Sequence, residues 1–273
     1  MGLLTINESR CKQDGFCVKE CPALIIQLPE KGYPEIVPGG DERCVECGHC
    51  VAVCPFDALQ NEKVPSAQSP SIMETLRISE TQAVQFLRSR RSIRHFKEKP
   101  VEPKLLKRLI EVARYAPTGG NRQAVEWLVI NDKSRIRNIA ALTVDWLREI
   151  VKDPQVVAAA PYLPLAIAAW DAGEDSVLRG APSVVIAIAP QEVMTGMVDL
   201  TLALSYLDLF APAMGLGTCW AGLLQGALIN SPSTKAAVGI PESYSQHYPI
   251  MVGYPDVKFY QVPERKTPKI TFL

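Results

Sequence analysis

The chain has 273 residues, a length that predicts one or two domains. Its hydrophobic content of 47% is that of a globular protein with a buried core and excludes a disordered chain. Lys and Arg balance Asp and Glu at 29 each, so the formal net charge is zero. The longest apolar runs, at residues 163–170 and 184–189, are shorter than the roughly 18 residues that span a bilayer, and Glu8 and Arg10 precede any apolar core. We therefore predict a cytoplasmic protein without a membrane segment.

The cysteines gather in two runs near the start of the chain. Seven of the eight lie within the first 54 residues. The second run, Cys44, Cys47, Cys50 and Cys54 followed by Pro55, has the C-x2-C-x2-C-x3-C-P spacing of an iron–sulfur ligand run.

The upstream run fits the same template with one exception. Three of its ligand positions hold Cys11, Cys17 and Cys21, whereas the second position holds Asp14. Seven cysteines and one carboxylate therefore fill eight ligand positions. A disulfide framework and a zinc site are the alternatives for such a density of cysteine. The ligand spacing, in a long chain whose first residues lack the pattern of an export signal, favours iron–sulfur clusters.

On the strength of these two runs, residues 1–62 resemble the two-cluster bacterial ferredoxins. The resemblance implies crossed ligation, in which the last cysteine of each run serves the other cluster. It implies one 4Fe–4S cluster held by Cys44, Cys47, Cys50 and Cys21. It implies a second cluster held by Cys11, Cys17 and Cys54, with Asp14 as the candidate fourth ligand. Because a carboxylate is a harder and weaker ligand for cluster iron than a thiolate, this second cluster is either 4Fe–4S or 3Fe–4S.

The charge is divided unevenly along the chain. Residues 1–65 carry six Lys+Arg and ten Asp+Glu, a net charge of −4, and the remainder carries 23 and 19, a net charge of +4. Ordinary solvated surface is one interpretation. The other is that an acidic electron-carrying module docks on a basic partner.

Three segments follow from these patterns. Residues 1–64 are predicted to form a ferredoxin-like domain of two short hairpins and two short helices, which metal binding stabilises. Residues 65–78 are rich in Pro and Ser and are predicted to be a linker. Residues 79–273 are predicted to form a second domain.

The elements of the second domain can be taken in order. Ser79 and Gln82 form a capping-box pattern at the start of a helix that ends near Ser89, with Ala83, Phe86 and Leu87 as its apolar face. A second helix begins at Pro103 and ends before Pro117. The patterns then predict a strand at 127–131, helices at 134–151 and 154–170, an all-apolar strand at 183–189, a helix at 196–214, and strands at 217–224 and 248–253 separated by a short helix after Ser231.

A basic segment stands at the start of this domain. Between Arg88 and Arg114 there are ten Lys+Arg and three acids. Within it, Arg90-Arg91-Ser92-Ile93-Arg94 combines guanidinium groups with a hydroxyl, which together can saturate the oxygens of a phosphate. A solvated helix end is the alternative. We predict no nucleic-acid binding, because the aromatic interleaving and the known modules are missing, and there is no P-loop.

From Ser79 to the C-terminus, the chain resembles the nitroreductase family of FMN enzymes. The resemblance rests on four sequence motifs that occur in the same order as in the family. They lie at residues 90–94, 116–123, 215–222 and 252–255, with Arg265 and Lys266 downstream. It implies an α+β domain with a central, mostly antiparallel sheet flanked by helices, and a homodimer. One departure is Ala124-Val125, where many members have Pro-Trp, so that side of the pocket is predicted to differ in shape.

The same resemblance implies roles for individual residues. Arg90 and Ser92, beside Arg91, would hold the FMN phosphate, to which Arg265 or Lys266 would return. Arg94 would face the N1 and O2 edge of the isoalloxazine, where positive charge stabilises the reduced flavin. Asn121 and Gln123 would hydrogen-bond the pyrimidine or ribityl groups, and backbone amides near Ala221 and Gly222 would lie close to N5. Asn121 could equally be only a turn residue.

These expectations combine into one function. We predict an FMN-dependent oxidoreductase whose iron–sulfur clusters pass electrons to or from the flavin and which reduces a nitroaromatic, a quinone or a similar small acceptor. NAD(P)H and an external ferredoxin are the candidate donors. No side chain is assigned as catalytic. The alternatives are a flavo-iron–sulfur protein that relays electrons to a protein partner without a small substrate, and a degenerate flavin fold with zinc in the cysteine runs.

Overall fold

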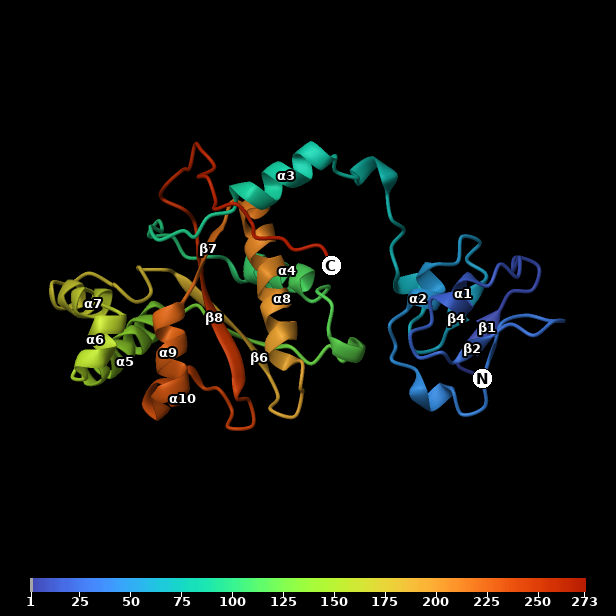
Figure 1. Cartoon of the computed structure of the whole chain (residues 1–273), viewed down its shortest axis with the longest axis horizontal. Helices are drawn as coiled ribbons and strands as arrows, with labels where there is room; N and C mark the ends of the chain where they lie inside the picture. The colour runs from blue at the N-terminus through green and yellow to red at the C-terminus, as the bar shows by residue number, and fades with distance from the viewer. Residues whose placement is uncertain (1) are drawn as a thin grey trace. The chain divides into compact units, whose positions relative to one another are not determined.

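Contacts between residues divide the chain into two units in the computed structural model, which describes residues 2–273 (Figure 1). The first unit ends at Arg77 and the second begins at Ile78. The short segment Gly120–Arg122 groups with the first unit.

The first unit contains two small antiparallel sheets. Strand β2 (Ile26–Gln27) pairs with β3 (Glu35–Ile36), which is a hairpin as predicted. Strand β1 (Leu4–Ile6) pairs with β4 (Leu59–Asn61). These two strands come from opposite ends of the unit, so the prediction of a second hairpin is wrong. The sequence pattern of short strands does not reveal which strands pair.

Two single-turn helices carry the cysteine runs. Helix α1 (Phe16–Lys19) follows Gly15 and helix α2 (His49–Ala52) follows Gly48, and both glycines have left-handed backbones, with φ of 73° and 70°. A side chain at either position would strain this turn. Each helix buries one cysteine of its run in a small core that also holds Leu3, Ile25, Ile26, Val51 and Leu59.

The predicted linker contains two short 3-10 helices, η2 (Ser66–Gln68) and η3 (Glu74–Leu76). Helix α3 (Glu80–Ser89) follows and begins at the predicted capping box, in which the Ser79 hydroxyl accepts from the Gln82 N–H and the Gln82 side chain accepts from the Ser79 N–H. Its apolar face is not part of a core, since Phe86 is 41% exposed and Leu87 is 58% exposed.

The second unit is built on one four-stranded sheet. Its strands, in spatial order, are β5 (Glu126–Ile130), β6 (Ser183–Ala189), β8 (Gln246–Gly253) and β7 (Gly217–Trp220). All three pairings are antiparallel. The predicted α+β fold class, with a mostly antiparallel sheet flanked by helices, is confirmed.

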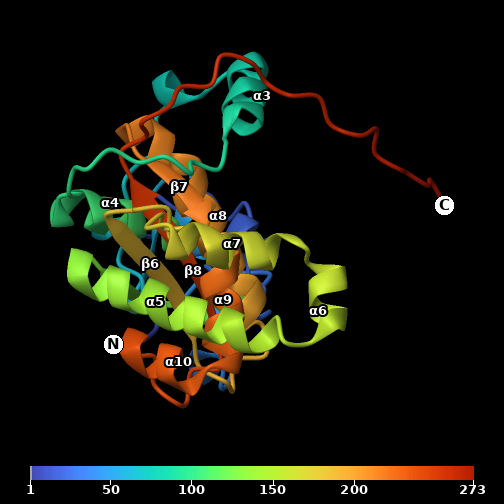
Figure 2. The same ribbon diagram turned by 90° about the vertical axis from the view of Figure 1, so that its left-hand side faces the viewer.

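Helices cover both faces of this sheet. Helices α4 (Pro103–Ala113) and α8 (Gly196–Phe210) pack on one face, and α5 (Lys133–Ile150) and α9 (Gly222–Asn230) pack on the other, which faces the viewer in Figure 2. Strand β6 shows the consequence. Alternate residues of β6 enter the two cores, so that Val184, Ile186 and Ile188 lie on the α5 side and Val185, Ala187 and Ala189 on the α8 side. A strand buried on both faces is apolar throughout.

Two boundaries differ from the predictions. The helix predicted over 154–170 is two helices, α6 (Pro154–Ala159) and α7 (Tyr162–Asp171), because Pro161 disfavours a helical backbone at the residue before it. The strand predicted over 217–224 ends at Trp220, and its last residues belong to α9. Apolar periodicity cannot separate a short buried strand from the start of a buried helix. The remaining elements are η1 (Asp41–Arg43), η4 (Gly119–Asn121), η5 (Ala211–Met214) and α10 (Pro232–Val238).

Among residues 2–273, one helical segment, Gly196–Met214, has the length and the mean hydropathy, 1.3, of a membrane span. Length and composition alone are weak evidence, since a core helix passes the same test. The leucines at 200, 204 and 207 are fully buried against the sheet, which is the packing of a core helix.

His247 on β8 makes the stability of this unit depend on pH. It is 3% exposed and hydrogen-bonds Gln225, and burial, with the nearby charge of Lys235, lowers its pKa. The unfolded chain therefore binds this proton more readily than the folded chain does. The stabilising effect is fully present above the unfolded pKa of about 6.5 and is lost as the pH falls towards the lower folded pKa.

We expect the His247→Asn variant to lose less stability than the wild type between pH 7.5 and pH 5.5. At pH 7.5 it should itself be about 1 kcal/mol less stable through altered packing. All four tryptophans lie between residues 127 and 220, so tryptophan fluorescence during thermal unfolding reports on this unit alone. An equal loss of stability between pH 7.5 and pH 5.5 in both proteins would show that His247 does not cause the pH dependence.

Candidate cofactor sites

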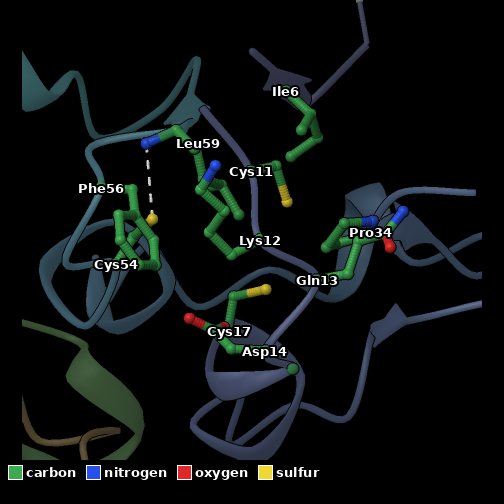
Figure 3. A pocket seen from close by; sticks show the side chains of 12 residues that line it. Ile6, Cys11, Lys12, Gln13, Asp14, Cys17, Pro34, Cys54, Phe56 and Leu59 are labelled. Carbon is green, nitrogen blue, oxygen red and sulfur yellow. Dashed lines mark hydrogen bonds between the residues drawn. The ribbon is translucent and has the colours of Figure 1, made fainter. Parts of the chain in front are cut away.

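The side chains of Cys11, Asp14, Cys17 and Cys54 line one cavity in the first unit. We call it the first cysteine cavity. In Figure 3 the three thiols point towards the same space. Asp14 Oδ1 accepts from the Phe16 N–H at 3.1 Å, and Cys54 Sγ accepts from the Ala58 N–H at 3.4 Å. The carboxylate thus stabilises the turn that precedes α1.

A second cavity is lined by Cys21, Cys44, Cys47 and Cys50, together with Asn61. We call it the second cysteine cavity. The last cysteine of each run thus lies with the first three ligand positions of the other run. This arrangement arises because α1 and α2 pack side by side, which brings the end of each run beside the start of the other.

The chemistry of these cavities suits iron. All eight cysteines of residues 2–273 are free thiols. Burial raises the pKa of Cys17 to about 11 and also raises that of Cys50, so these thiols stay protonated unless a positive charge lies beside them. The iron of a bound cluster would supply that charge, and thiolate is the soft ligand that iron–sulfur clusters use. Within the same residues, no three His, Cys, Asp or Glu side chains converge on a single metal ion. The donor sets fit two clusters.

Four arginines lie at one cavity in the second unit. Its lining includes Arg88, Arg90, Arg91 and Arg265. We call it the arginine cavity. The Arg91 guanidinium donates to the carbonyls of Arg90 and Arg88, at 2.8 and 2.9 Å, while its buried Nε has no partner among the described atoms. A buried N–H donor without a partner is costly, so the cavity fits an anionic ligand.

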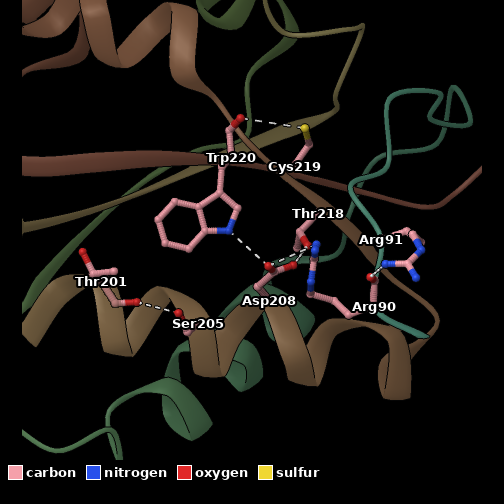
Figure 4. Close-up of polar contacts among 8 residues, drawn as sticks. All are labelled: Arg90, Arg91, Thr201, Ser205, Asp208, Thr218, Cys219 and Trp220. Atoms are coloured by element: carbon pink, nitrogen blue, oxygen red, sulfur yellow. Dashed lines mark hydrogen bonds and ion pairs between the residues drawn. The ribbon is translucent and has the colours of Figure 1, made fainter. Parts of the chain in front are cut away.

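Asp208 forms an ion pair with Arg90 and lies beside its guanidinium group (Figure 4). This carboxylate on α8 is 5% exposed, lies 3.5 Å from Arg90 Nη1, and accepts hydrogen bonds from the Thr218 hydroxyl and, at 3.1 Å, from the Trp220 indole N–H. A buried carboxylate needs such partners. Asp208 therefore connects the start of the basic segment to strand β7.

Strand β7 is joined to the basic segment through the backbone as well. Ser92 forms an isolated parallel bridge with Thr218, and the Ile93 N–H donates to the Thr218 carbonyl at 2.8 Å. A Cβ at Gly217 would clash with Ile93, so only glycine permits this approach. Burial raises the pKa of nearby Cys219, which remains a neutral thiol, and the Arg94 side chain is exposed.

The other predicted flavin residues are dispersed. Asn121 and Gln123 occupy a turn with left-handed backbones, at φ of 54° and 49°, and Lys266 is exposed near the C-terminus. None of the three lines the arginine cavity as described. The Ala221 N–H donates to the Pro249 carbonyl at 3.0 Å, so it is not free for a ligand. Gly222 begins α9, where the first N–H groups lack partners within the helix.

Two acids that organise these sites were missed in the sequence. Asp199 is 2% exposed and accepts from the Gly119 N–H at 3.1 Å and from the Thr195 hydroxyl at 2.9 Å, which positions the turn that precedes Gln123. Asp208 acts similarly on Arg90. Both stand in the otherwise apolar helix α8, and an acid in a core helix is the signal that could have identified them.

Comparison with known proteins agrees with the division of the chain into two units. Residues 87–254 match the family model described as the nitroreductase family, and residues 3–67 match the model described as a 4Fe-4S dicluster domain. The first match covers more than half of the chain. The chain belongs to the nitroreductase family and carries a 4Fe–4S dicluster ferredoxin domain at its N-terminal end.

Solved structures resemble the second unit. A nitroreductase with bound FMN from Bacteroides fragilis is 18% identical, with a TM-score of 0.58, over 71% of this chain and 100% of that one. A nitroreductase with bound FMN from Desulfitobacterium hafniense is 22% identical, with a TM-score of 0.55, over 72% and 100%. A BluB-like flavoprotein from Clostridium difficile is 20% identical, with a TM-score of 0.54, over 70% and 96%. At these identities the likeness shows the fold.

Proposed function

We propose that the protein is an FMN-dependent oxidoreductase that uses two iron–sulfur clusters to pass electrons to or from its flavin and reduces a small acceptor such as a nitroaromatic or a quinone. The observation that carries the proposal is the arginine cavity, an anion site on a nitroreductase fold whose chain also carries a ferredoxin domain. Bound FMN was found in two of the similar nitroreductases.

The flavin phosphate is proposed to occupy the arginine cavity. There a phosphate oxygen would provide the partner that Arg91 Nε lacks, and Arg90 and Arg265 would neutralise the charge. Ser92 and Lys266 do not line this cavity, and they are proposed as further phosphate ligands from the family resemblance alone. The isoalloxazine is proposed to lie towards Arg94 and the start of α9 at Gly222, with Asn121 and Gln123 on its polar edge. Ala221 is left without a direct role, because its N–H is already bonded.

The clusters are proposed to be ligated across the two runs. One is held by the four thiolates of the second cysteine cavity. The other is held by Cys11, Cys17 and Cys54 in the first cysteine cavity, with Asp14 as the fourth ligand of a 4Fe–4S cluster or beside a 3Fe–4S cluster. Both cavities have the thiol content that such clusters need.

Bound FMN supplies the conversion between one-electron transfer at the clusters and two-electron reduction of an acceptor. The chain's own residues would bind the flavin and orient it. Arg90 and Arg91 anchor the phosphate end, and Asp208 restricts Arg90 to one position. Either NAD(P)H or an external ferredoxin is proposed as the donor, and no side chain is assigned as proton donor.

We also propose that the chain acts as a homodimer. Apolar side chains on two helices of the second unit are exposed. They are Val84, Phe86 and Leu87 on α3, and Met197, Val198 and Tyr206 on α8. A second copy would cover such faces. Light scattering of the purified protein should therefore give twice the chain mass, and a monomer at micromolar concentration would contradict this.

Anaerobically purified protein tests the proposal as a whole. We expect a brown protein that contains iron, releases FMN on denaturation, and turns over many times with a nitroaromatic or a quinone when NAD(P)H or reduced ferredoxin is supplied. A colourless zinc protein would contradict the clusters. Absence of released flavin would show that the assignment of Arg90, Ser92 and Arg94 is wrong. If the protein is reduced but no acceptor supports multiple turnover, the electron-relay alternative would be favoured.

A further inference from the structure

Asn61, the last residue of β4, is buried at the wall of the second cysteine cavity. It is 3% exposed. A buried amide must satisfy both its oxygen and its nitrogen with hydrogen bonds. Its Oδ1 accepts from the Lys63 N–H at 3.0 Å. This bond fixes the amide, so that the NH2 group faces the cavity.

The NH2 group meets two candidate cluster ligands. Asn61 Nδ2 lies 3.8 Å from Cys50 Sγ and 4.0 Å from Cys44 Sγ. The opposite orientation of the amide would place its NH2 donor against the Lys63 N–H, which is a repulsive contact, so the Lys63 N–H decides which way the amide points.

We propose that Asn61 raises the reduction potential of the cluster in the second cysteine cavity. The inference rests on the proposed function for the presence of that cluster. Reduction adds one electron to a thiolate-bound cluster and increases its negative charge. Hydrogen bonds to the sulfurs stabilise the more negative state more strongly, and the potential rises.

The first cysteine cavity is built differently. There Cys54 Sγ accepts from the backbone N–H of Ala58, and Asp14 adds a carboxylate. A carboxylate beside a cluster opposes the addition of an electron, because like charges repel. Asn61 therefore widens the difference between the two clusters. An electron that enters this unit rests on the cluster of the second cysteine cavity.

Redox titration of the full-length, anaerobically purified protein tests the inference, with each cluster followed by EPR. In Asn61→Leu the cluster of the second cavity should titrate at a lower potential. At the wild-type midpoint its ratio of reduced to oxidised form should fall by about three- to tenfold, which is about 28 to 59 mV for a one-electron couple. The first-cavity cluster is the internal control and should change by less than about twofold.

Further variants test whether the lost hydrogen bonds cause the fall in potential. Asn61→Asp keeps the shape but replaces the donor with a negative charge, so its potential should fall at least as far as that of the leucine variant. Gln60→Leu alters the exposed neighbour on the same strand and should move neither cluster. If the leucine variant does not assemble its cluster, the same fall is expected in Asn61→Asp and in Asn61→Ala.

An unchanged midpoint in an Asn61 variant that retains its cluster would overturn the inference, and so would an equal shift of both clusters. A wild-type protein without iron would instead refute the proposed function itself. The spectra can be assigned independently, because the signal that disappears when Cys54 is replaced belongs to the first cysteine cavity.

Discussion

Replacement of Cys54 with serine is expected to remove the cluster of the first cysteine cavity and to leave the other cluster in place. Replacement of Cys21 should do the reverse. Each of these cysteines lies in space with the other run, so each loss should affect the cavity opposite to its own sequence neighbours. Serine is a harder and weaker ligand for cluster iron. Iron content should fall by about half in either variant, and EPR of the reduced protein shows which cluster remains.

Cys219→Ser provides the matched control. This eighth cysteine is buried in β7, outside both cavities, and its replacement should leave the iron content unchanged. If Cys54→Ser lost the cluster of Cys44, Cys47 and Cys50 and kept the other, ligation would follow the runs in sequence and the crossed arrangement would be wrong.

Replacement of Arg90 with glutamine should weaken FMN binding to the apoprotein by about 10- to 100-fold. A hydrogen bond to a charged group contributes roughly 1.5–3 kcal/mol, and about 1.4 kcal/mol corresponds to a tenfold change in Kd. Riboflavin has the same ring system without the phosphate, so its Kd should change by less than about twofold. Flavin fluorescence titration measures both ligands.

The comparison of FMN with riboflavin distinguishes the loss of a phosphate contact from a loss of fold stability. Arg90→Gln also removes the cation beside buried Asp208, which lowers stability, so a thermal unfolding curve must accompany each titration. Equal weakening of FMN and riboflavin would mean that Arg90 supports the fold and does not contact the phosphate. Arg108→Gln, on the exposed side of α4, removes an arginine that pairs with Glu111, outside the arginine cavity, and should alter neither affinity.

Local patterns predicted much of the fold because the physics that decides them is local. Strand β6 is apolar at every position and matches the predicted range of 183–189 at both ends. The capping box at Ser79 located the start of α3, since its bonds join residues three apart. The predictions failed where neighbours in space decide the structure. The end of β7 is set by its pairing with β8, and the partner of β1 lies more than fifty residues away.

For the candidate sites, sequence spacing predicted eight ligand positions in the cysteine runs and a phosphate site at Arg90, and the predicted cysteines, Asp14 and Arg90 line cavities in the structure. Those features depend on residues only a few positions apart. Asn61, Asp199 and Asp208 were not identified, because each acts on groups brought near by the fold. Asn61 meets a thiol 17 residues away, and Asp199 holds the N–H of a glycine 80 residues away.

The sequence by itself thus determined the chemical types present, namely thiols at iron-ligand spacing, guanidinium groups beside a hydroxyl, and the order of the four segments that resemble the nitroreductase family. Only the tertiary structure decided how they group. The packing of α1 on α2 puts Cys21 and Cys54 in opposite cavities, and α8 places a buried carboxylate under Arg90. The physical reason is that burial and hydrogen-bond satisfaction depend on contacts between distant segments, which spacing along the chain does not contain.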